Sequence, residues 1–250
     1  MEKPLIIAHR GASFLAPENT LSSVKLAWEL GAPAVEIDVR KTMDGQAAVI
    51  HNASTKHMTG RFKIIRFSTL NQLQKLDFGV LKDQKWKGER IAVLSSILDT
   101  IPEKGRLFIE IKTTKAVLPI IKNLLKTYSF RDEQINFLAF NFKTAVKTKK
   151  MFPENMVLYI YEHYLRQPSA GYFLNKIEAG GLDGLDISVH PSVDQKFAAA
   201  FKNAGKKLIV WTVNDPAEAK RLIDIGIDGI TTDRPGWLRE QLKIIYGIHI

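Results

Sequence analysis

Two pairs of charged residues lie two positions apart in otherwise apolar stretches of this sequence. Glu36 and Asp38 fall within the apolar run 35–39, and Glu110 and Lys112 close a second such run. Residues two apart on a β-strand point to the same side of the sheet, so each pair would present its two charges together. Either pair alone is more often a solvated strand face or an exposed ion pair. A charge inside a strand of Ile, Val, Leu and Phe nevertheless needs a reason.

Other polar residues come at the ends of apolar, strand-length runs. They are His9 and Arg10 at the first run, His51 at the third, Trp211 near position 210, and Asp233 after the last. In a β/α barrel the active site is built at the carboxyl ends of the strands, so these residues would gather with the two charged pairs. Taken singly, His-Arg-Gly fits a surface turn equally well, and a lone tryptophan more often packs in the core or at the rim than contacts a ligand.

Three carboxylates, from Glu36, Asp38 and Glu110, would then converge. Carboxylates brought together repel one another and are costly to bury unless a cation joins them. Their oxygen atoms suit one hard divalent ion, Ca²⁺ or Mg²⁺, and the sequence does not choose between the two. The chain has no cysteine, which rules out thiolate ligands and disulfides. We therefore expect a metal site built from oxygen ligands.

The remaining polar groups suit phosphate chemistry. A histidine pKa lies near neutrality, which fits His9 and His51 for proton transfer. Arg10 and Lys112 supply positive charge for a phosphate group. A metal, two cations and two imidazoles together indicate phosphoryl chemistry. The other four histidines lack a strand-end setting, and we expect surface or packing roles for them: His57, His163, His190 and His249.

The elements that must hold these residues alternate between strand and helix patterns. Apolar runs of strand length recur at 5–9, 35–39, 47–51, 107–111, 135–140, 157–161, 185–189, 208–213 and 227–231. Helical periodicity lies between most of them. The link containing Asp44-Gly45 is too short for a crossover helix, so the second and third runs are expected to form a local hairpin. Repeated βα units predict an α/β fold, a single TIM (β/α)8 barrel domain over 1–250 with a small insertion after the third strand.

The insertion, at about 52–90, is strongly basic. It holds nine Lys or Arg and three acids, so its own net charge of +6 is more than half of the chain's net charge of +10. A basic patch attracts anions and leaves open a weak membrane-surface contact, although a solvated face is the plainer interpretation. Its cations do not interleave regularly with aromatic residues, so we expect no nucleic-acid partner. No targeting segment or membrane-length apolar run is visible, which predicts a cytoplasmic protein.

The polar residues above belong to an ordered set of motifs that resembles the glycerophosphodiester phosphodiesterase family. Each motif is weak by itself, and the order of the whole set carries the resemblance. It runs nearly end to end through His9-Arg10-Gly11, Pro17-Glu18-Asn19-Thr20, Glu36-x-Asp38-Val39, Thr42-x-Asp44-Gly45, His51, Glu110-Ile111-Lys112, Trp211-Thr212-Val213-Asn214 and Asp228-Gly229-Ile230-x-Thr232-Asp233-x-Pro235.

The resemblance implies a barrel of the phosphatidylinositol-phospholipase-C-like type and a role for each site residue. It implies metal-dependent hydrolysis of small-molecule glycerophosphodiesters to glycerol 3-phosphate and an alcohol such as choline or ethanolamine. The implied roles are one divalent metal ion held by Glu36, Asp38 and Glu110, an acid–base pair of His9 and His51, phosphate binding by Arg10 and Lys112, and a substrate cleft lined by Trp211.

Two departures from the family pattern bear on substrate preference. Asn52 stands where the family usually has Asp after the second histidine, and Lys56-His57-Met58-Thr59 replaces an Arg-Thr-Thr-like stretch.

Two alternative functions stay open. One is a lysophospholipase-D-type hydrolase that acts at a membrane surface through the basic insertion, and the other is a phosphate-ester-binding barrel without turnover. The alcohol preference, which histidine is the base, and the oligomeric state do not follow from the sequence.

Overall fold

Eight parallel strands close into a barrel in the computed structural model, which describes residues 3–112, 115–163 and 168–248. β1 pairs with both β10 and β2, which closes the ring in the order β1-β10-β9-β8-β7-β6-β5-β2. The barrel strands are β1 (Leu5–Ala8), β2 (Ala34–Lys41), β5 (Arg106–Ile111), β6 (Ile135–Ala139), β7 (Val157–Tyr161), β8 (Gly184–Ser188), β9 (Lys207–Trp211) and β10 (Gly229–Thr232). This confirms the predicted TIM barrel.

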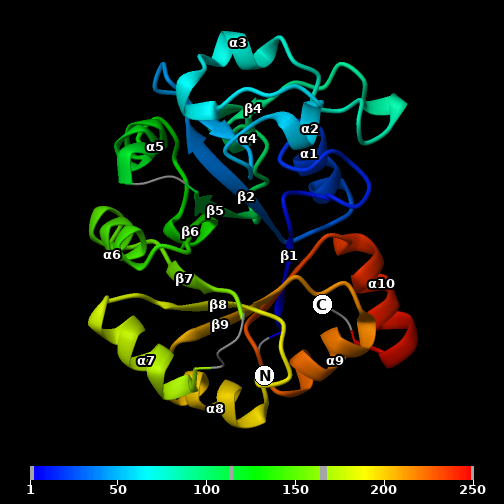
Figure 1. Ribbon diagram of the computed structural model, residues 1–250. Helices are drawn as coiled ribbons and strands as arrows, with labels where there is room; N and C mark the ends of the chain where they lie inside the picture. The colour runs from blue at the N-terminus through cyan, green and yellow to red at the C-terminus, as the bar shows by residue number, and fades with distance from the viewer. Residues whose placement is uncertain (1–2, 113–114, 164–167, 249–250) are drawn as a thin grey trace.

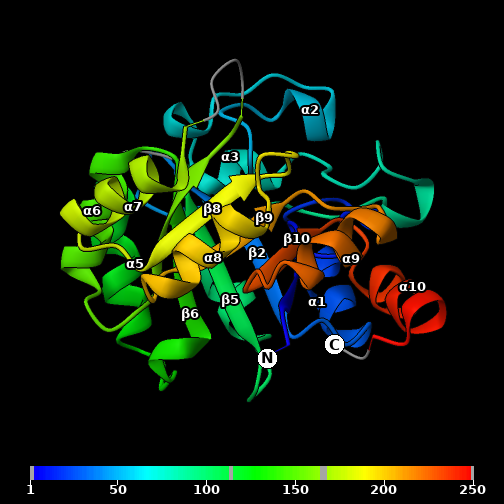
Figure 2. The same cartoon turned by 90° about the horizontal axis from the view of Figure 1, so that it is seen from below.

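Helices surround the strands on the outside of the ring (Figures 1 and 2). Each barrel strand contributes apolar side chains to the large core between strands and helices, as the near-continuous apolar strand sequences require for a parallel sheet. The α-helices are α1 (Leu21–Glu29), α2 (Lys56–Thr59), α3 (Leu70–Gln74), α4 (Leu94–Leu98), α5 (Leu118–Leu125), α6 (Phe142–Met151), α7 (Ala170–Ala179), α8 (Gln195–Asn203), α9 (Pro216–Asp224) and α10 (Pro235–Tyr246). Short 3₁₀ turns lie at Ile65–Phe67, Gln84–Trp86, Lys115–Val117 and Asp132–Gln134.

The inside of the barrel is filled by a second, smaller apolar cluster. It includes Ile7, Phe108, Leu158 and Ile209, all nearly inaccessible to solvent. Polar residues two positions further along the same strands point to the same side of the sheet. Glu110, which follows Phe108 in this way, therefore lies between the apolar cluster and the carboxyl end of the barrel. The apolar cluster therefore fills the barrel interior directly beneath the polar site.

The third strand in chain order lies outside the barrel. β3 (Ala47–Val49) runs antiparallel to β2, which confirms the predicted hairpin, and β4 (Ala92–Val93) pairs antiparallel with β3. The insertion thus begins with β3 and ends with β4, slightly wider than the predicted 52–90, and it follows the second barrel strand.

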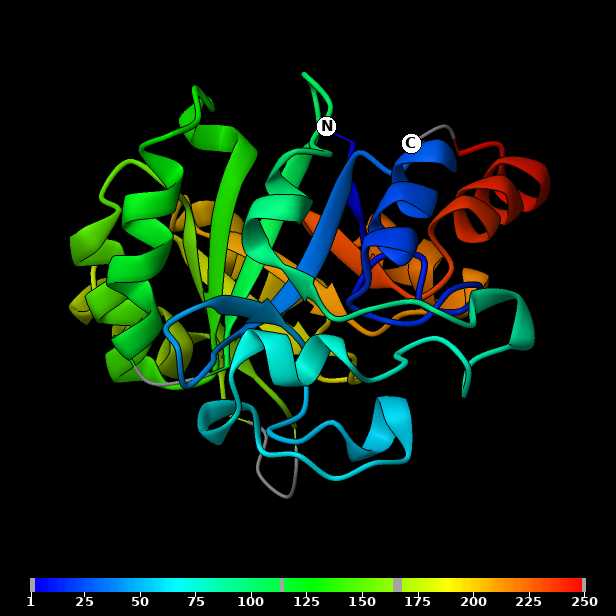
Figure 3. The same ribbon diagram turned by 90° about the horizontal axis from the view of Figure 1, so that it is seen from above.

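The insertion carries its own apolar cluster, which includes Ile50, Ile65, Leu73 and Phe78. It lies on the side of β2 and α1, away from α7 and α8 (Figure 1), and beyond the end of the barrel to which the β2 arrow points (Figure 3). It therefore stands beside the carboxyl ends of the strands. Within the described residues, no helix is both long enough and apolar enough to cross a membrane.

Candidate active site

A cavity of about 430 Å³ opens at the carboxyl ends of the barrel strands. Seven of the eight site residues expected from the sequence lie on its wall, and the eighth, Asp38, is fully buried with its carboxylate against theirs. The lining comprises His9, Arg10, Glu36, His51, Glu110, Lys112, Leu138, Phe140, Ile160, Glu162, Asp186, Trp211 and Thr231. The structure therefore brings together all eight expected site residues.

Three carboxylates form the centre of this cavity. One oxygen from each of Glu36, Asp38 and Glu110 lies within 4.8 Å of the others, and all three residues are buried. Burial, followed by repulsion from Asp38, raises the pKa of Glu110 to about 8, and burial with repulsion from both neighbours raises the pKa of Glu36 well above its usual range. Burial opposes ionisation of Asp38 as well, but Arg10 and Lys112 outweigh it and hold its pKa below the usual value.

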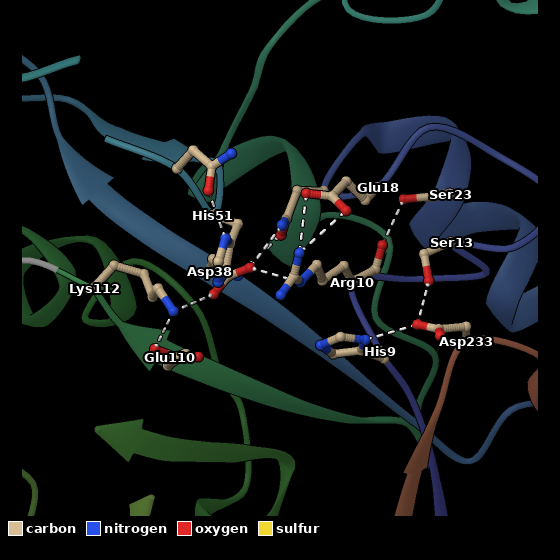
Figure 4. Close-up of polar contacts among 12 residues, drawn as sticks. His9, Arg10, Ser13, Glu18, Ser23, Asp38, His51, Glu110, Lys112 and Asp233 are labelled. Atoms are coloured by element: carbon tan, nitrogen blue, oxygen red, sulfur yellow. Dashed lines mark hydrogen bonds and ion pairs between the residues drawn. The ribbon is translucent and has the colours of Figure 1, made fainter. Parts of the chain in front are cut away.

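Two cations border the carboxylates without neutralising them fully (Figure 4). Lys112 Nζ lies 2.8 Å from Glu110 and 3.5 Å from Asp38, and Arg10 Nε lies 3.3 Å from Asp38. Asp38 Oδ1 has no hydrogen-bond partner among the residues described. This buried oxygen has only the 3.5 Å ion pair with Lys112 and lies within a repelling cluster, which suits a hard divalent cation, so the donor set fits Ca²⁺ or Mg²⁺.

The loop after β1 adopts an unusual backbone that positions Arg10. Arg10 itself has a positive φ of 55°, and its backbone N–H donates to Glu36 at 3.0 Å. Gly11 follows with φ 82°, and a Cβ there would lie 2.5 Å from the backbone of Ser23 in α1. The glycine of the His-Arg-Gly motif is therefore required by contact with the helix as well as by conformation. Backbone strain of this kind is typical of functional sites.

Residues of the second motif, Pro-Glu-Asn-Thr, bind the side chains of Arg10 and Asp38. Glu18 accepts two hydrogen bonds of 3.1 Å from Arg10, and Asn19 both donates to Asp38 Oδ2 at 2.7 Å and accepts from the Asp38 N–H. Thr20 is the cap of α1, since its side chain accepts from the Ser23 N–H. Asn19 instead fixes a carboxylate of the central cluster.

His9 is held by a carboxylate. Its Nδ1–H donates to Asp233 at 2.7 Å, and the same carboxylate accepts from Ser13 and from Asn214 at 3.0 and 2.6 Å. Burial opposes ionisation of Asp233, but the hydrogen bonds from His9, Asn214 and Ser13 lower its pKa to about 2. Since the Nδ1 proton is committed to Asp233, Nε2 is the nitrogen left for chemistry.

His51 is held by a neutral amide. Its Nδ1–H donates to Asn52 Oδ1 at 2.8 Å. Burial lowers the pKa of His51, and Arg10 and Lys112 lower it further against the opposing effect of Asp38. The two imidazoles of the site therefore differ in the group that binds their Nδ1, which is a carboxylate for His9 and an amide for His51. This difference traces to Asn52, where the resembling family usually has Asp.

Six wall residues were not singled out in the sequence, and they include Phe140, Glu162 and Asp186. Phe140 meets Trp211 edge to face at 5.8 Å, and Lys112 lies 5.2 Å from its ring. A signal existed for Asp186, because it is a charge in the middle of the apolar run 185–189. The argument that drew attention to Glu36 and Glu110 applies to it equally.

The expectation for the other histidines is partly wrong. His163 lies two residues after the end of β7, so it has the strand-end setting that it was thought to lack, and its ring stacks on His190 at 4.5 Å. Its Nδ1 lies within hydrogen-bonding distance of Ser188. His57 is exposed on α2, as expected, and His249 lies outside the described residues. Neither His163 nor His190 borders the cavity.

Fold and site together define a TIM barrel with a buried carboxylate cluster, two cations and two imidazoles at the mouth. Comparison with known proteins is consistent with that class. Residues 9–237 match the glycerophosphoryl diester phosphodiesterase family. A glycerophosphodiester phosphodiesterase of Caldanaerobacter subterraneus is 35% identical over 93% of this chain and 95% of its own length. The chain belongs to the glycerophosphoryl diester phosphodiesterase family, an enzyme family of phosphoric diester hydrolases.

Solved structures agree with this assignment. A phosphodiesterase of Oleispira antarctica, solved in complex with the product sn-glycerol-3-phosphate, is similar with a TM-score of 0.88 and 30% identity, covering 96% of this chain and 97% of that one. The glycerophosphodiester phosphodiesterase of Thermotoga maritima has a TM-score of 0.77 at 24% identity, over 96% and 99% of the two chains, and supports the fold.

Proposed function

We propose that this chain hydrolyses glycerophosphodiesters to sn-glycerol 3-phosphate and an alcohol, and that it does so with one divalent metal ion. The observation that carries the proposal is the cluster of Glu36, Asp38 and Glu110, with one oxygen of each within 4.8 Å of the others, inside the cavity that His9 and His51 also line. The relative from Oleispira antarctica, solved with sn-glycerol-3-phosphate, supports the product. We further propose that the barrel and its basic insertion work as one domain and that the protein acts in the cytoplasm.

The roles of the charged residues follow from their positions. Glu36, Asp38 and Glu110 would hold Ca²⁺ or Mg²⁺, which supplies positive charge beside the phosphate when bound. Arg10 and Lys112 are already anchored at Glu18 and Glu110, so they offer fixed cations for the phosphate oxygens. Trp211, with Phe140, would bound the part of the cleft that takes the substrate's organic portion.

The two histidines would divide the proton transfers. The lowered pKa of His51 keeps it neutral near pH 7, so we assign it as the base that deprotonates the attacking hydroxyl, from water or from the glycerol 2-OH. Asp233 holds His9 through the 2.7 Å contact at Nδ1, which leaves Nε2 for proton transfer, so we assign His9 as the acid that protonates the leaving alcohol. Mass spectrometry of the products tests the bond cleaved: glycerol 3-phosphate with choline supports the proposal, and glycerol with phosphocholine contradicts it.

The variant Asn52→Asp tests the assignment of the base. A carboxylate at the present 2.8 Å contact would favour the imidazolium form and raise the pKa of His51 by about one unit or more. Because a base must be neutral to act, the acid limb of kcat/KM should move to higher pH by the same amount. The measurement is the pH profile of kcat/KM from pH 5 to 9. An unchanged acid limb would mean that His51 is not the base.

A second candidate activity is lysophospholipase D action at a membrane surface. Phe14, Leu15 and Leu81 are all exposed, and Lys82 and Arg234 contact the Phe14 ring at 6.0 and 3.6 Å. Exposed apolar side chains with cations suit an anionic lipid surface. Lys82 also donates to the Ser13 carbonyl beside His9, so this surface adjoins the site.

Vesicle binding tests that candidate. Lys85 and Lys87 are exposed, and neither makes the Ser13 contact. Their joint replacement by Gln should lower the affinity for phosphatidylglycerol vesicles, measured by sedimentation, by roughly thirtyfold, at about 1 kcal/mol per cation. The matched control replaces Lys147 and Lys150, which are exposed on α6, and should leave binding unchanged. Equal loss in both double variants would show only non-specific attraction.

A further inference from the structure

Asp186 is a buried carboxyl on the wall of the cavity, far from the carboxylate cluster. It lies on β8, and in the closed ring of eight strands three strands separate β8 from β2 in either direction. Glu36 and Asp38 are on β2, so Asp186 faces the cavity from the opposite wall. Its register partners on the two neighbouring strands are Ile160 and Ile209, both buried and apolar.

One oxygen of this carboxyl has no hydrogen bond within the part of the chain that the structure describes. Asp186 is 4% exposed, and its Oδ1 has no hydrogen-bond partner among the described residues. The same holds for Nε1 of Trp211, which is on the adjacent strand β9 and borders the same cavity. Leaving a buried polar atom unpaired costs stability, so two such atoms on one cavity wall indicate a partner that arrives with the ligand.

The chemical form of Asp186 limits what that partner can be. Burial raises its pKa to about 8, so near neutrality the group is a neutral carboxylic acid. A neutral carboxyl offers one O–H donor together with acceptor oxygens, and the indole N–H adds a second donor. An alcohol hydroxyl, which both donates and accepts, pairs with this set. The phosphate itself would lie across the cavity at Arg10 and Lys112.

We propose that Asp186, together with Trp211 Nε1, forms a hydroxyl-binding subsite that recognises an alcohol group of the substrate and contributes to its specificity. The proposal rests on the phosphodiesterase activity proposed above and adds a residue that the metal cluster and the histidine pair do not include. The hydroxyl has two sources: the glycerol portion common to every glycerophosphodiester, or the second alcohol, which carries hydroxyls in glycerophosphoglycerol and none in glycerophosphocholine.

Two variants of similar size separate hydrogen bonding from packing. Asp186→Asn keeps a donor and an acceptor, and we expect kcat/KM within about threefold of the wild type. Asp186→Leu removes both, and we expect KM for glycerophosphoglycerol to rise tenfold or more, from the lost bond and the unpaired substrate hydroxyl. Leu should leave the melting temperature unchanged or higher, because it replaces an unpaired polar group in an apolar wall.

The comparison of two substrates identifies the source of the hydroxyl. A loss confined to glycerophosphoglycerol assigns the second alcohol, and an equal loss with glycerophosphocholine assigns the glycerol portion. The pH profile adds an independent readout: wild-type kcat/KM should fall above about pH 8 as Asp186 ionises beside an anionic substrate, and Asp186→Asn should reduce that fall.

Calorimetric binding of glycerophosphoglycerol in the presence of Ca²⁺, with His51→Ala added to each protein compared, keeps this test separate from turnover. Tenfold weaker binding by the Leu variant, with the Asn variant close to wild type, supports the subsite even in an enzyme that turns over slowly. Unchanged KM and binding in Asp186→Leu for both substrates would overturn the subsite and leave the proposed function intact. Failure of the wild type to bind or cleave either substrate would overturn both.

Discussion

Replacing His51 by alanine is expected to lower kcat for glycerophosphocholine by about 10²–10⁴-fold, with a much smaller change in KM. His51 borders the cavity that holds the carboxylate cluster, and its Nδ1–H is fixed by Asn52 at 2.8 Å, so its other nitrogen is oriented for proton transfer. Removing the imidazole leaves the metal ligands and the phosphate-binding cations in place. The loss should therefore appear in the chemical step.

The matched control is His57→Ala, which removes an exposed histidine on α2 of the same insertion. It should retain wild-type turnover and stability. His9→Ala should resemble His51→Ala, and the double variant should lose less than the product of the two effects, since the histidines act in one reaction. Turnover within a few-fold of wild type in His51→Ala would refute the acid–base assignment.

The second large effect is expected from Glu36→Gln, which should lower metal affinity and reduce turnover by about two orders of magnitude or more. The same variant should make the metal-free protein more stable. Burial and repulsion from Asp38 and Glu110 raise the pKa of Glu36, so its ionised form destabilises the native state. Gln has nearly the same shape and no charge.

The linked pH dependence has a defined sign. Glu110 has a native pKa of about 8, above its unfolded value of about 4.3, so its contribution to stability is complete below about pH 4 and is lost as pH rises towards 8. Metal-free wild type should therefore melt lower at pH 8 than at pH 6, and saturating Ca²⁺ or Mg²⁺ should reduce that difference. Thermal melts with and without metal measure both. A Glu36→Gln protein that is less stable without metal and binds metal normally would contradict the ligand set.

The barrel was predictable because each of its strands is a continuous apolar run bounded by turn residues. The carboxylate pair on β2 was predictable for the related reason that charges inside such a run are costly. Residue spacing alone could place Glu36 and Asp38 on one side of a strand, but only the register of β2 with β5 brings Asp38 beside Glu110. Which strands neighbour each other is a property of the closed ring.

Other features depend on contacts between distant segments. Asn19 has the composition and position of a helix cap, yet it binds Asp38 across the loop, which no local pattern reveals. β4 has two residues and is defined only by its pairing with β3. Asp186 was visible as a charge in an apolar run, but its significance depends on the unpaired oxygen and the facing cavity.

The most direct test of the account is release of sn-glycerol 3-phosphate from glycerophosphocholine, measured before and after EDTA treatment and again after adding back Ca²⁺ or Mg²⁺ separately. The carboxylate cluster predicts release that EDTA abolishes and that one of the two ions restores. Release unaffected by complete removal of metal would contradict the metal site, and no release with either ion from any glycerophosphodiester would contradict the proposed function itself.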